Sequence, residues 1–291
     1  MRVLVTGSAG FLGSHFTRSL TDEGHHVTEI DVLATDPVDA RDFFRRSADR
    51  FDLVLHCAAV VGGRRTIDYA PMEQAVDLEL DAGLFRWALG DYVGRVVYFS
   101  SSAAYPVARQ RTPWLLAECD ADPFDPLLPD ALYGWTKLTG ERLAHHAREA
   151  GLPVTVVRPF SGYGTDQAPT YPFPAICRRA IERHDPIVVW GDGNQVRDFI
   201  HVDDLVAATL ALAKAGVDGP VNIGTGRPTS MFDLATLAAE AVGYRPRIEA
   251  RPDEPQGVAY RVADCSLFQT YYTPQVSLEE GIARFVEAEC G

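Results

Sequence analysis

The stretch VLVTGSAGFLGS, residues 3–14, sets three glycines at intervals of three directly after a run of β-formers. A strand that leads through such glycines into a helix is the context in which this spacing indicates a dinucleotide site. Gly7 permits the tight turn, Gly10 lets the backbone approach a pyrophosphate, and Gly13 lets helix and strand pack closely. The spacing alone is a weak signal, so the rest of the chain has to support it.

The second predicted strand, HVTEID at 26–31, ends in a carboxylate, Asp31, 18 residues after Gly13. A carboxylate at this place accepts hydrogen bonds from the adenosine ribose hydroxyls and repels a 2′-phosphate. We therefore expect a bound dinucleotide, with NAD preferred over NADP.

Short apolar runs alternate with longer amphipathic stretches through the first two thirds of the chain. The predicted strands are 3–6, 26–31, 52–59, 95–101 and 154–160, and the predicted helices are 11–24, 71–89 and 134–150. Strands that are apolar on both faces and alternate with helices predict a covered parallel sheet. The fold class is therefore α/β, a Rossmann-like doubly wound parallel sheet with a smaller mixed α/β substrate-binding lobe.

The division into two parts follows from a change of rhythm near residue 160, where Pro, Gly and aromatic residues become dense. We expect an NAD-binding domain over 1–159 plus about 202–226, because a helix at 202–215 and a strand at 221–224 return to the main sheet. An interleaved substrate lobe takes about 160–201 and 227–291.

Composition narrows the class of ligand. The 291 residues carry a formal net charge of −13, which argues against nucleic acid or an anionic membrane surface as a partner. Any anionic ligand must therefore be met by a local cluster of cations. Five scattered cysteines without a C-x-x-C pair indicate a reducing cytoplasm, no apolar run is long enough to span a membrane, and the histidines show no metal-binding spacing.

The segment ALYGWTKLTGERL places Tyr133 and Lys137 four residues apart, on one face of a helix. The chain has only two lysines, and the other is Lys214. An ammonium beside a phenol favours the phenolate and lowers its pKa, and it can also hold a nicotinamide ribose. With the serines at 100–102, this pair predicts proton transfer to or from a substrate hydroxyl.

These motifs together resemble the extended short-chain dehydrogenase/reductases, in particular the nucleotide-sugar epimerases and dehydratases. The matching segments are TGSAGFLG, HCAAVVGG, RVVYFSSSAAYP, YGWTK, VRPFSGYG, WGDGNQVRDFIHVDD, VNIGTGRPTS and VSLEEGI, and they cover nearly the whole chain. The resemblance implies NAD as cofactor and a nucleotide sugar as substrate. It implies cofactor contacts at Gly7, Gly10, Phe11, Leu12, Gly13, Asp31, Asp39, Ala40, Ala58, Ala59, Tyr133, Lys137, Pro159 and Phe160.

The resemblance also assigns roles. Ser101 holds the reacting hydroxyl, with Ser102 as the alternative, Tyr133 is the general acid or base, and Lys137 tunes it. Arg197 meets the substrate diphosphate and Arg261 is a plausible second cation, unless each pairs with a neighbour such as Asp198 or Asp264. The implied substrate contacts are Ser102, Ser161, Arg197 and Arg261.

Departures from the family pattern narrow the reaction. Related dehydratases and decarboxylases carry an acid one or two places after the catalytic serine, and two other groups carry a cysteine, whereas here Ser102 and Ala103 stand there. The remaining chemistry is oxidation and re-reduction of a sugar alcohol, a C4 epimerisation through a 4-keto intermediate. Asp77 and Ser161 stand where asparagine is frequent.

Other hypotheses stay open. The 114–130 insertion carries Glu118, Asp120 and Asp122, any of which could approach the site and serve a dehydratase. A nucleotide-sugar 4-ketoreductase and a non-catalytic NAD-binding regulator are further alternatives. The resemblance also implies a homodimer built from the helices at 71–89 and 134–150.

Overall fold

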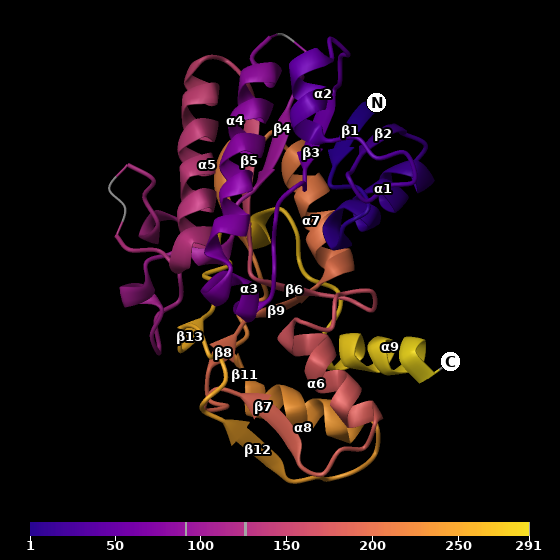
Figure 1. Ribbon diagram of the computed structural model, residues 1–291, viewed down its shortest axis with the longest axis vertical. Helices are drawn as coiled ribbons and strands as arrows, with labels where there is room; N and C mark the ends of the chain where they lie inside the picture. Colours follow the sequence, from indigo (N-terminus) through magenta and orange to yellow (C-terminus); the bar gives the residue numbers. More distant parts are fainter. Residues whose placement is uncertain (91, 125–126, 291) are drawn as a thin grey trace.

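A six-stranded parallel sheet forms the centre of the computed structural model, which describes residues 1–90, 92–124 and 127–290 (Figure 1). The strand order is β10-β5-β4-β3-β1-β2. The strands are β1 (Arg2–Thr6), β2 (His26–Ile30), β3 (Leu53–His56), β4 (Val96–Phe99), β5 (Val154–Pro159) and β10 (Gly219–Ile223). The predicted α/β class with a covered parallel sheet is confirmed.

Helices cover both faces of the sheet. They are α1 (Phe11–Asp22) and α7 (Val202–Lys214) on one face, and α2 (Ala40–Arg46), α4 (Val76–Ala88) and α5 (Ala131–Glu149) on the other. Along β1, Val3 and Val5 enter the core beneath α1 and α7, whereas Leu4 enters the core beneath α4 and α5. This alternation of buried faces is why the strands read as continuous apolar runs.

Three predicted elements differ from the structure by several residues. The expected strands at 52–59 and 95–101 stop at His56 and Phe99, because the chain leaves the sheet there toward the open carboxyl edge. The expected helix at 71–89 begins with a 3₁₀ segment, Pro71–Ala75, and becomes α-helical only at Val76.

The smaller part has its own core. Its helices are α6 (Pro172–Ile181), α8 (Met231–Ala241) and α9 (Leu278–Cys290). Two small sheets have two strands each: β6 (Ser161–Tyr163) with β9 (Phe199–His201), and β7 (Ile187–Trp190) with β12 (Ile248–Arg251). A third sheet has three strands, in the order β11 (Thr229–Ser230), β8 (Val196–Arg197) and β13 (Tyr260–Arg261). Phe173 and Phe285 lie at the centre of this core. Ala263 and Phe268 pack instead in the core beneath α1 and α7, so the functional division of the chain stays a prediction.

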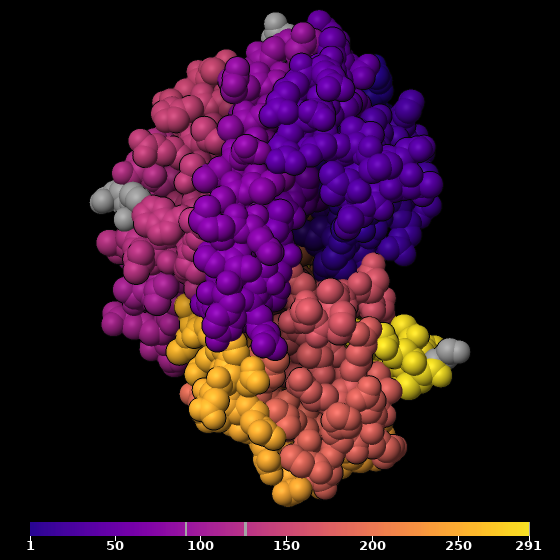
Figure 2. Space-filling view, in the orientation of Figure 1, coloured from indigo at the N-terminus to yellow at the C-terminus, as the bar shows by residue number. Residues whose placement is uncertain are grey.

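The two parts meet below the carboxyl edge of the sheet. Figure 2 shows a hollow between them, bridged by the segment that includes α3 (Arg64–Tyr69). A Cβ on Gly63, just before α3, would lie 2.5 Å from the carbonyl oxygen of Thr170, in the loop that leads into α6. The absence of a side chain at Gly63 therefore lets the segment before α3 contact the loop before α6, beside the hollow.

A buried ion pair holds the insertion to the sheet. Arg158 on β5 is fully buried and its guanidinium donates to both carboxylate oxygens of Glu141 on α5, at 2.8 and 2.6 Å. The same guanidinium donates to the carbonyls of Glu118 and Ala121, at 2.7 and 3.0 Å. The position of residues 118–121 therefore depends on Arg158.

Among the described residues, no helix combines the length and apolar character needed to cross a membrane. All five cysteines lie in the described part of the chain and are free thiols.

Removing the Arg158 guanidinium leaves the Glu141 carboxylate buried without its partner. We expect Arg158→Met to lower the free energy of unfolding by about 3–5 kcal/mol, measured by chemical denaturation. The matched control is Arg178→Met, because Arg178 forms an exposed pair with Glu289 and its loss should cost less than about 1 kcal/mol. Equal losses in the two variants would contradict the structural role assigned to Arg158.

Candidate active site

A cavity of about 320 Å³ lies at the carboxyl edge of β1, β2 and β3, where the glycine-rich turn ends. Gly7 has a φ of +69°, and a Cβ there would lie 2.6 Å from the amide nitrogen of Ala58. A Cβ on Gly13 would lie 2.0 Å from the carbonyl oxygen of Gly7. Both positions therefore require glycine. The lining includes these predicted cofactor residues: Gly7, Gly10, Asp31, Asp39, Ala40, Ala58 and Ala59.

The polar groups of this cavity fit NAD. Helix α1 begins after Gly10 with no side-chain cap and no acidic residue in its first turn, so its N-terminal amides suit a pyrophosphate. Asp31 is fixed beside them, because its carboxylate accepts from the amides of Ala9 and Leu33 at 2.9 and 2.7 Å. Residues 31–38 contain no Lys or Arg that could hold a 2′-phosphate. Arg41 lines the cavity but is paired with Asp39 at 2.6 Å.

Ser101 and Tyr133 come together where α5 meets the turn after β4. A Cβ on Gly134 would lie 2.3 Å from the carbonyl oxygen of Ala103, so the start of α5 rests directly on that turn. The Ser101 hydroxyl lies close enough to the Tyr133 phenol to lower its pKa, and it accepts from the amide of Ala103 at 3.1 Å. Ser100 instead donates to Glu141. Of these two adjacent serines, Ser101 is therefore the one that reaches Tyr133.

Lys137 lies one turn after Tyr133, with its Nζ 5.8 Å from the centre of the phenol ring. Burial raises the pKa of Tyr133, and the Lys137 ammonium only partly opposes that rise. Lys137 thus lowers the pKa of Tyr133 as expected, but burial raises that pKa by more. Burial by itself would lower the pKa of Lys137, yet the neighbouring Tyr133, Asp81 and Asp77 raise it, so the ammonium stays charged.

Two buried carboxylates on α4 lie beneath Lys137. Asp77 accepts from the amide of Val60 at 2.7 Å through Oδ1, and its Oδ2 has no hydrogen-bond partner among the described residues. Burial raises the pKa of Asp77, against the attraction of Lys137. Asp81 accepts from the Tyr98 hydroxyl at 2.7 Å and lies 3.4 Å from Nε2 of His56. His56, the last residue of β3, is thus part of a buried polar network.

The remaining predicted residues have the following positions. Phe11 starts α1 and its ring packs on that of His15, with Leu12 next to it. Pro159 ends β5, and the buried Phe160 donates its amide to Ile223. Ser102 is buried in the turn after β4, and Ser161 begins β6. None of these observations by itself tests a ligand contact.

Four arginines line a second cavity, of about 240 Å³, between the two parts, and three of them, Arg64, Arg197 and Arg261, lie near Asp130. Arg64 and Arg261 both donate to Asp130, at 2.9 and 2.6 Å. Arg197 has no carboxylate partner among the described residues, and its guanidinium donates only to backbone carbonyls, those of Val196, Gln256 and Val258. Burial, with repulsion from Arg261 and Arg64, lowers the pKa of Arg197 to about 9.

Neither arginine pairs with the carboxylate that the sequence offered as its neighbour, although Arg261 does form an ion pair. Arg197 does not pair with Asp198, whose carboxylate accepts from the backbone amides of Thr225, Gly226 and Ala263. Arg261 pairs with Asp130 and not with Asp264, which accepts from Ser266. The cavity therefore presents excess positive charge, which suits a diphosphate.

The insertion acids are engaged elsewhere. Glu118 accepts from the amide of Asn222 at 2.9 Å, Asp120 pairs with Arg109 and accepts from Trp114, and Asp122 accepts from the amide of Phe124. None of the three lines the cofactor or arginine cavity. Asp125 and Pro126 of the insertion lie outside the described residues.

Sequence reasoning missed several residues of the arginine cavity. They are Arg64, Asp130, Thr170, Tyr171, Arg179, Trp190 and Gln195. The only sequence features that pointed to this cavity were GGRR at 62–65 and the segment rich in aromatic residues and proline after residue 160.

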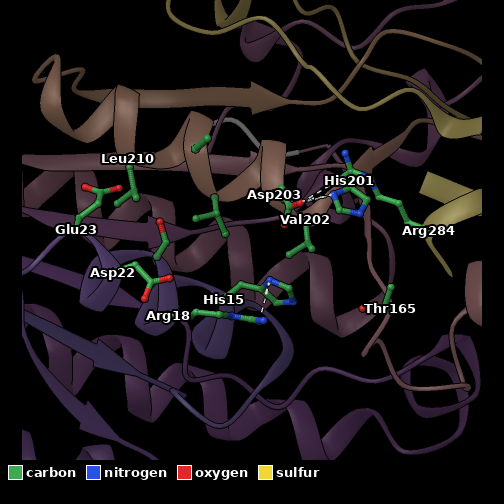
Figure 3. Close-up of a pocket in the computed structure, with 13 residues that line it drawn as sticks. His15, Arg18, Asp22, Glu23, Thr165, His201, Val202, Asp203, Leu210 and Arg284 are labelled. Atoms are coloured by element: carbon green, nitrogen blue, oxygen red, sulfur yellow. Dashed lines mark hydrogen bonds and ion pairs between the residues drawn. The ribbon is translucent and has the colours of Figure 1, made fainter. Parts of the chain in front are cut away.

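A larger cavity, of about 740 Å³, is a separate groove between α1 and α7 (Figure 3). His15 lies 2.9 Å from Asp166, His201 accepts from the amide of Asp203, and Arg284 lies 3.2 Å from Asp203. No predicted catalytic or cofactor residue lines it, and no cluster of metal-ligating residues occurs in the described part of the chain. His201 is the N-cap of α7, so its side chain has a structural role there.

Comparison with known proteins gives the family. Residues 3–224 match the NAD dependent epimerase/dehydratase family. The chain belongs to this family. NAD is therefore its cofactor, and the predicted preference for this dinucleotide is in accord with the family.

Individual relatives differ in activity. The chain is 31% identical, over 91% of its length and 88% of the relative, to dTDP-4-dehydro-6-deoxy-D-allose reductase of a Streptomyces species. It matches the structure of Thermus thermophilus UDP-glucose 4-epimerase in complex with NAD with a TM-score of 0.86 and 26% identity, covering 100% and 99% of the two chains. MoeE5 in complex with UDP-glucose and NAD gives 0.84 and 30%, also over 100% and 99%. The family is clear, and the reaction type within it is not fixed by similarity.

The Asp77 carboxylate provides a test of the site's electrostatics. After burial, the charges of Lys137 and Asp77 are the largest influences on the pKa of Tyr133, and Asp77 raises it. Asp77→Asn removes that negative charge, so the pKa of Tyr133 should fall. In a pH profile of kcat/KM, the limb that reports ionisation of the phenol should move to lower pH.

The matched control is Glu79→Gln on the exposed side of the same helix, where Glu79 pairs with Arg41. Its profile should equal that of the parent protein. A shift of the Asp77→Asn limb to higher pH, or no shift, would contradict the assigned geometry.

Proposed function

We propose that the protein is an NAD-dependent epimerase that inverts C4 of a nucleotide-diphosphate sugar through a transient 4-keto sugar. The observation that carries this proposal is the contact of Ser101 with Tyr133 beside Lys137, next to a cavity that fits NAD. NAD, when bound, takes up the hydrogen of the sugar carbon with its electron pair and gives it back.

The chain's own residues supply the rest of the chemistry. Ser101 orients the sugar hydroxyl, and Tyr133 removes its proton when the carbon is oxidised and returns a proton when the ketone is reduced. Lys137 stabilises the phenolate and holds the cofactor ribose. Arg197 and Arg261, with Arg64, neutralise the diphosphate, so the sugar end of the substrate is directed to Tyr133.

Three other functions, a dehydratase, a 4-ketoreductase and a non-catalytic NAD-binding protein, have less support than the epimerase. A dehydratase needs an additional acid or base, and Ser102, Ala103 and the engaged acids of the insertion do not supply one. A 4-ketoreductase needs only the same triad, and similarity to a reductase favours it as the second candidate. A non-catalytic NAD-binding protein would not require Ser101, Tyr133 and Lys137 to converge.

The division of labour is also part of the proposal. Residues 1–159 and about 202–226 hold NAD through the predicted contact set, and about 160–201 and 227–291 hold the nucleotide sugar. Ser102, in the turn after β4, and Ser161, at the start of β6, contact the sugar.

The experiment is incubation of the purified protein with a panel of UDP-, dTDP-, GDP-, CDP- and ADP-sugars, without added reduced cofactor. An epimerase converts one of them to its C4 epimer, and NAD co-purifies in stoichiometric amount. A requirement for steady consumption of reduced cofactor would instead establish the reductase.

Tyr133→Phe tests the assigned acid and base. Because only the hydroxyl is removed, NAD should still bind, while kcat should fall by about 10²–10⁴-fold. NAD content of the variant is measured by absorbance and mass, and turnover by product analysis. A variant that retains parental activity would exclude the roles proposed for both the epimerase and the reductase.

We further propose a homodimer formed through the exposed faces of α4 and α5, which pack on each other along the same side of the sheet. Leu78 and Trp135 are exposed there by 38% and 37%. Burial of such side chains favours association.

Sedimentation should show a dimer that Trp135→Glu dissociates, whereas Leu267→Glu, at an exposed leucine elsewhere, leaves it intact. A monomeric parent protein would contradict this interface.

A further inference from the structure

Gln110 joins the arginine cavity to the turn after β4. Its side chain is buried, with the residue 3% exposed. Its Nε2 donates to the Tyr105 carbonyl at 2.8 Å, and its Oε1 accepts from Nε of Arg261 at 2.6 Å. Exchange of the amide oxygen and nitrogen would place oxygen against oxygen at one end and N–H against N–H at the other, so the two partners fix its orientation.

Tyr105 gives Gln110 a rigid attachment. It ends the short 3₁₀ turn that begins after Ser101. Its side chain is fully buried, and its hydroxyl donates to Asn222 at 2.6 Å and accepts from Arg158 at 3.1 Å. Gln110 is therefore bonded to the turn that holds Ser101, through a residue that is itself fixed in the core.

Arg261 is held from a second side by Asp130. Its Nη2 donates to Oδ2 of Asp130 at 2.6 Å, and the amide of Asp130 donates to the Ala103 carbonyl in the same turn at 3.0 Å. Gln110 and Asp130 thus occupy one edge of the planar guanidinium, formed by Nε and Nη2. Nη1 has no hydrogen-bond partner among the described residues, and Arg261 lines the arginine cavity. The free end of the guanidinium is therefore available to an anion in the cavity.

The contact with Gln110 adds what Asp130 alone does not supply. A single contact at Nη2 leaves the guanidinium free to rotate about it, whereas a second contact at Nε fixes its plane. An arginine side chain has many rotamers, and a phosphate that meets an unfixed one must order it on binding. With both contacts made, that ordering has already taken place in the folded chain.

We infer that Gln110 is a positioning residue, which holds the Arg261 guanidinium oriented for the substrate diphosphate and in a fixed position relative to Ser101. The inference rests on the proposed function, because that function assigns the diphosphate to Arg197 and Arg261. Gln110 does not itself contact the substrate, and its effect passes through Arg261.

The test is isothermal titration of the full chain, loaded with NAD, with UDP, dTDP, GDP, CDP and ADP. Gln110→Met keeps the length of the side chain and removes its acceptor and donor. The nucleotide that the parent protein binds most tightly should bind this variant about 10-fold more weakly, with an unchanged NAD content. Parental affinity in a folded Gln110→Met would overturn the inference. Binding of none of the five by the parent protein would overturn the proposed function as well.

The matched control is Gln167→Met, which should keep the parental affinity. Gln167 is also buried, at 6% exposed, and its Nε2 likewise donates to a backbone carbonyl, that of Gly162 at 2.8 Å. It lies outside the lining of the arginine cavity. A 10-fold loss in this variant too would show that removing any buried amide weakens the nucleotide, and it would contradict the role assigned to Gln110.

A double-mutant cycle separates positioning from general support of the fold. In Arg261→Met protein, adding Gln110→Met should weaken the nucleotide by less than about 2-fold, because Gln110 acts through Arg261. Equal weakening in both backgrounds would contradict positioning. Arg261→Lys decides the matter if Gln110→Met does not fold, since lysine keeps the charge but lacks the two-sided contact, so affinity should again fall about 10-fold. Parental affinity in Arg261→Lys would show that charge alone suffices.

Discussion

The start of α5 rests on the carbonyl of Ala103, and the whole site depends on this contact. Gly134 allows it sterically, and the amide of Asp130 donates to the same carbonyl at 3.0 Å. Tyr133 is thereby held beside Ser101. Between Asp130 and Tyr133, Ala131 has a φ of +58°, a conformation that costs a non-glycine residue about 1–2 kcal/mol. The packing and hydrogen bonds around Asp130 maintain that strain.

Asp130 also connects this junction to the arginine cavity. Its side chain accepts from Arg64 and Arg261, while its backbone holds the turn that contains Ser101. Opposing burial, these two guanidinium groups keep the pKa of Asp130 below its ordinary value. One short segment thus borders both the arginine cavity and the turn that holds Ser101, and in a chain with a net charge of −13 two partly buried arginines gather at it.

The parallel sheet and the cofactor cavity were predictable because their signals are local. The alternation of apolar strands and helices follows from burial on both faces, and Gly7, Gly13 and Asp31 act within a single strand-turn-helix unit. The convergence of Tyr133 and Lys137 follows from helical spacing. The carboxylate beneath them, Asp77, stood out only as a departure from the family pattern.

The arginine cavity was much less predictable, because its residues meet through tertiary contacts between loops. Nothing in the sequence around Arg64 indicates that its guanidinium donates to Asp130, 66 positions later. The same holds for Glu118, which the sequence offered as a possible catalytic acid and which instead accepts from the backbone of Asn222. Charge pairs of this kind are settled by the packing of distant segments, which periodicity does not encode.

The central claim is that Tyr133, Ser101 and Lys137 suffice for reversible oxidation at C4 when NAD supplies the hydride acceptor and donor. The most direct measurement is proton NMR of the sugar product after turnover in D₂O by the NAD-loaded protein, without added reductant. The account predicts the C4 epimer with protium retained at C4 and no deuterium at C3, C5 or C6. Deuterium at any of these carbons, or a product that forms only with stoichiometric reductant, would contradict it.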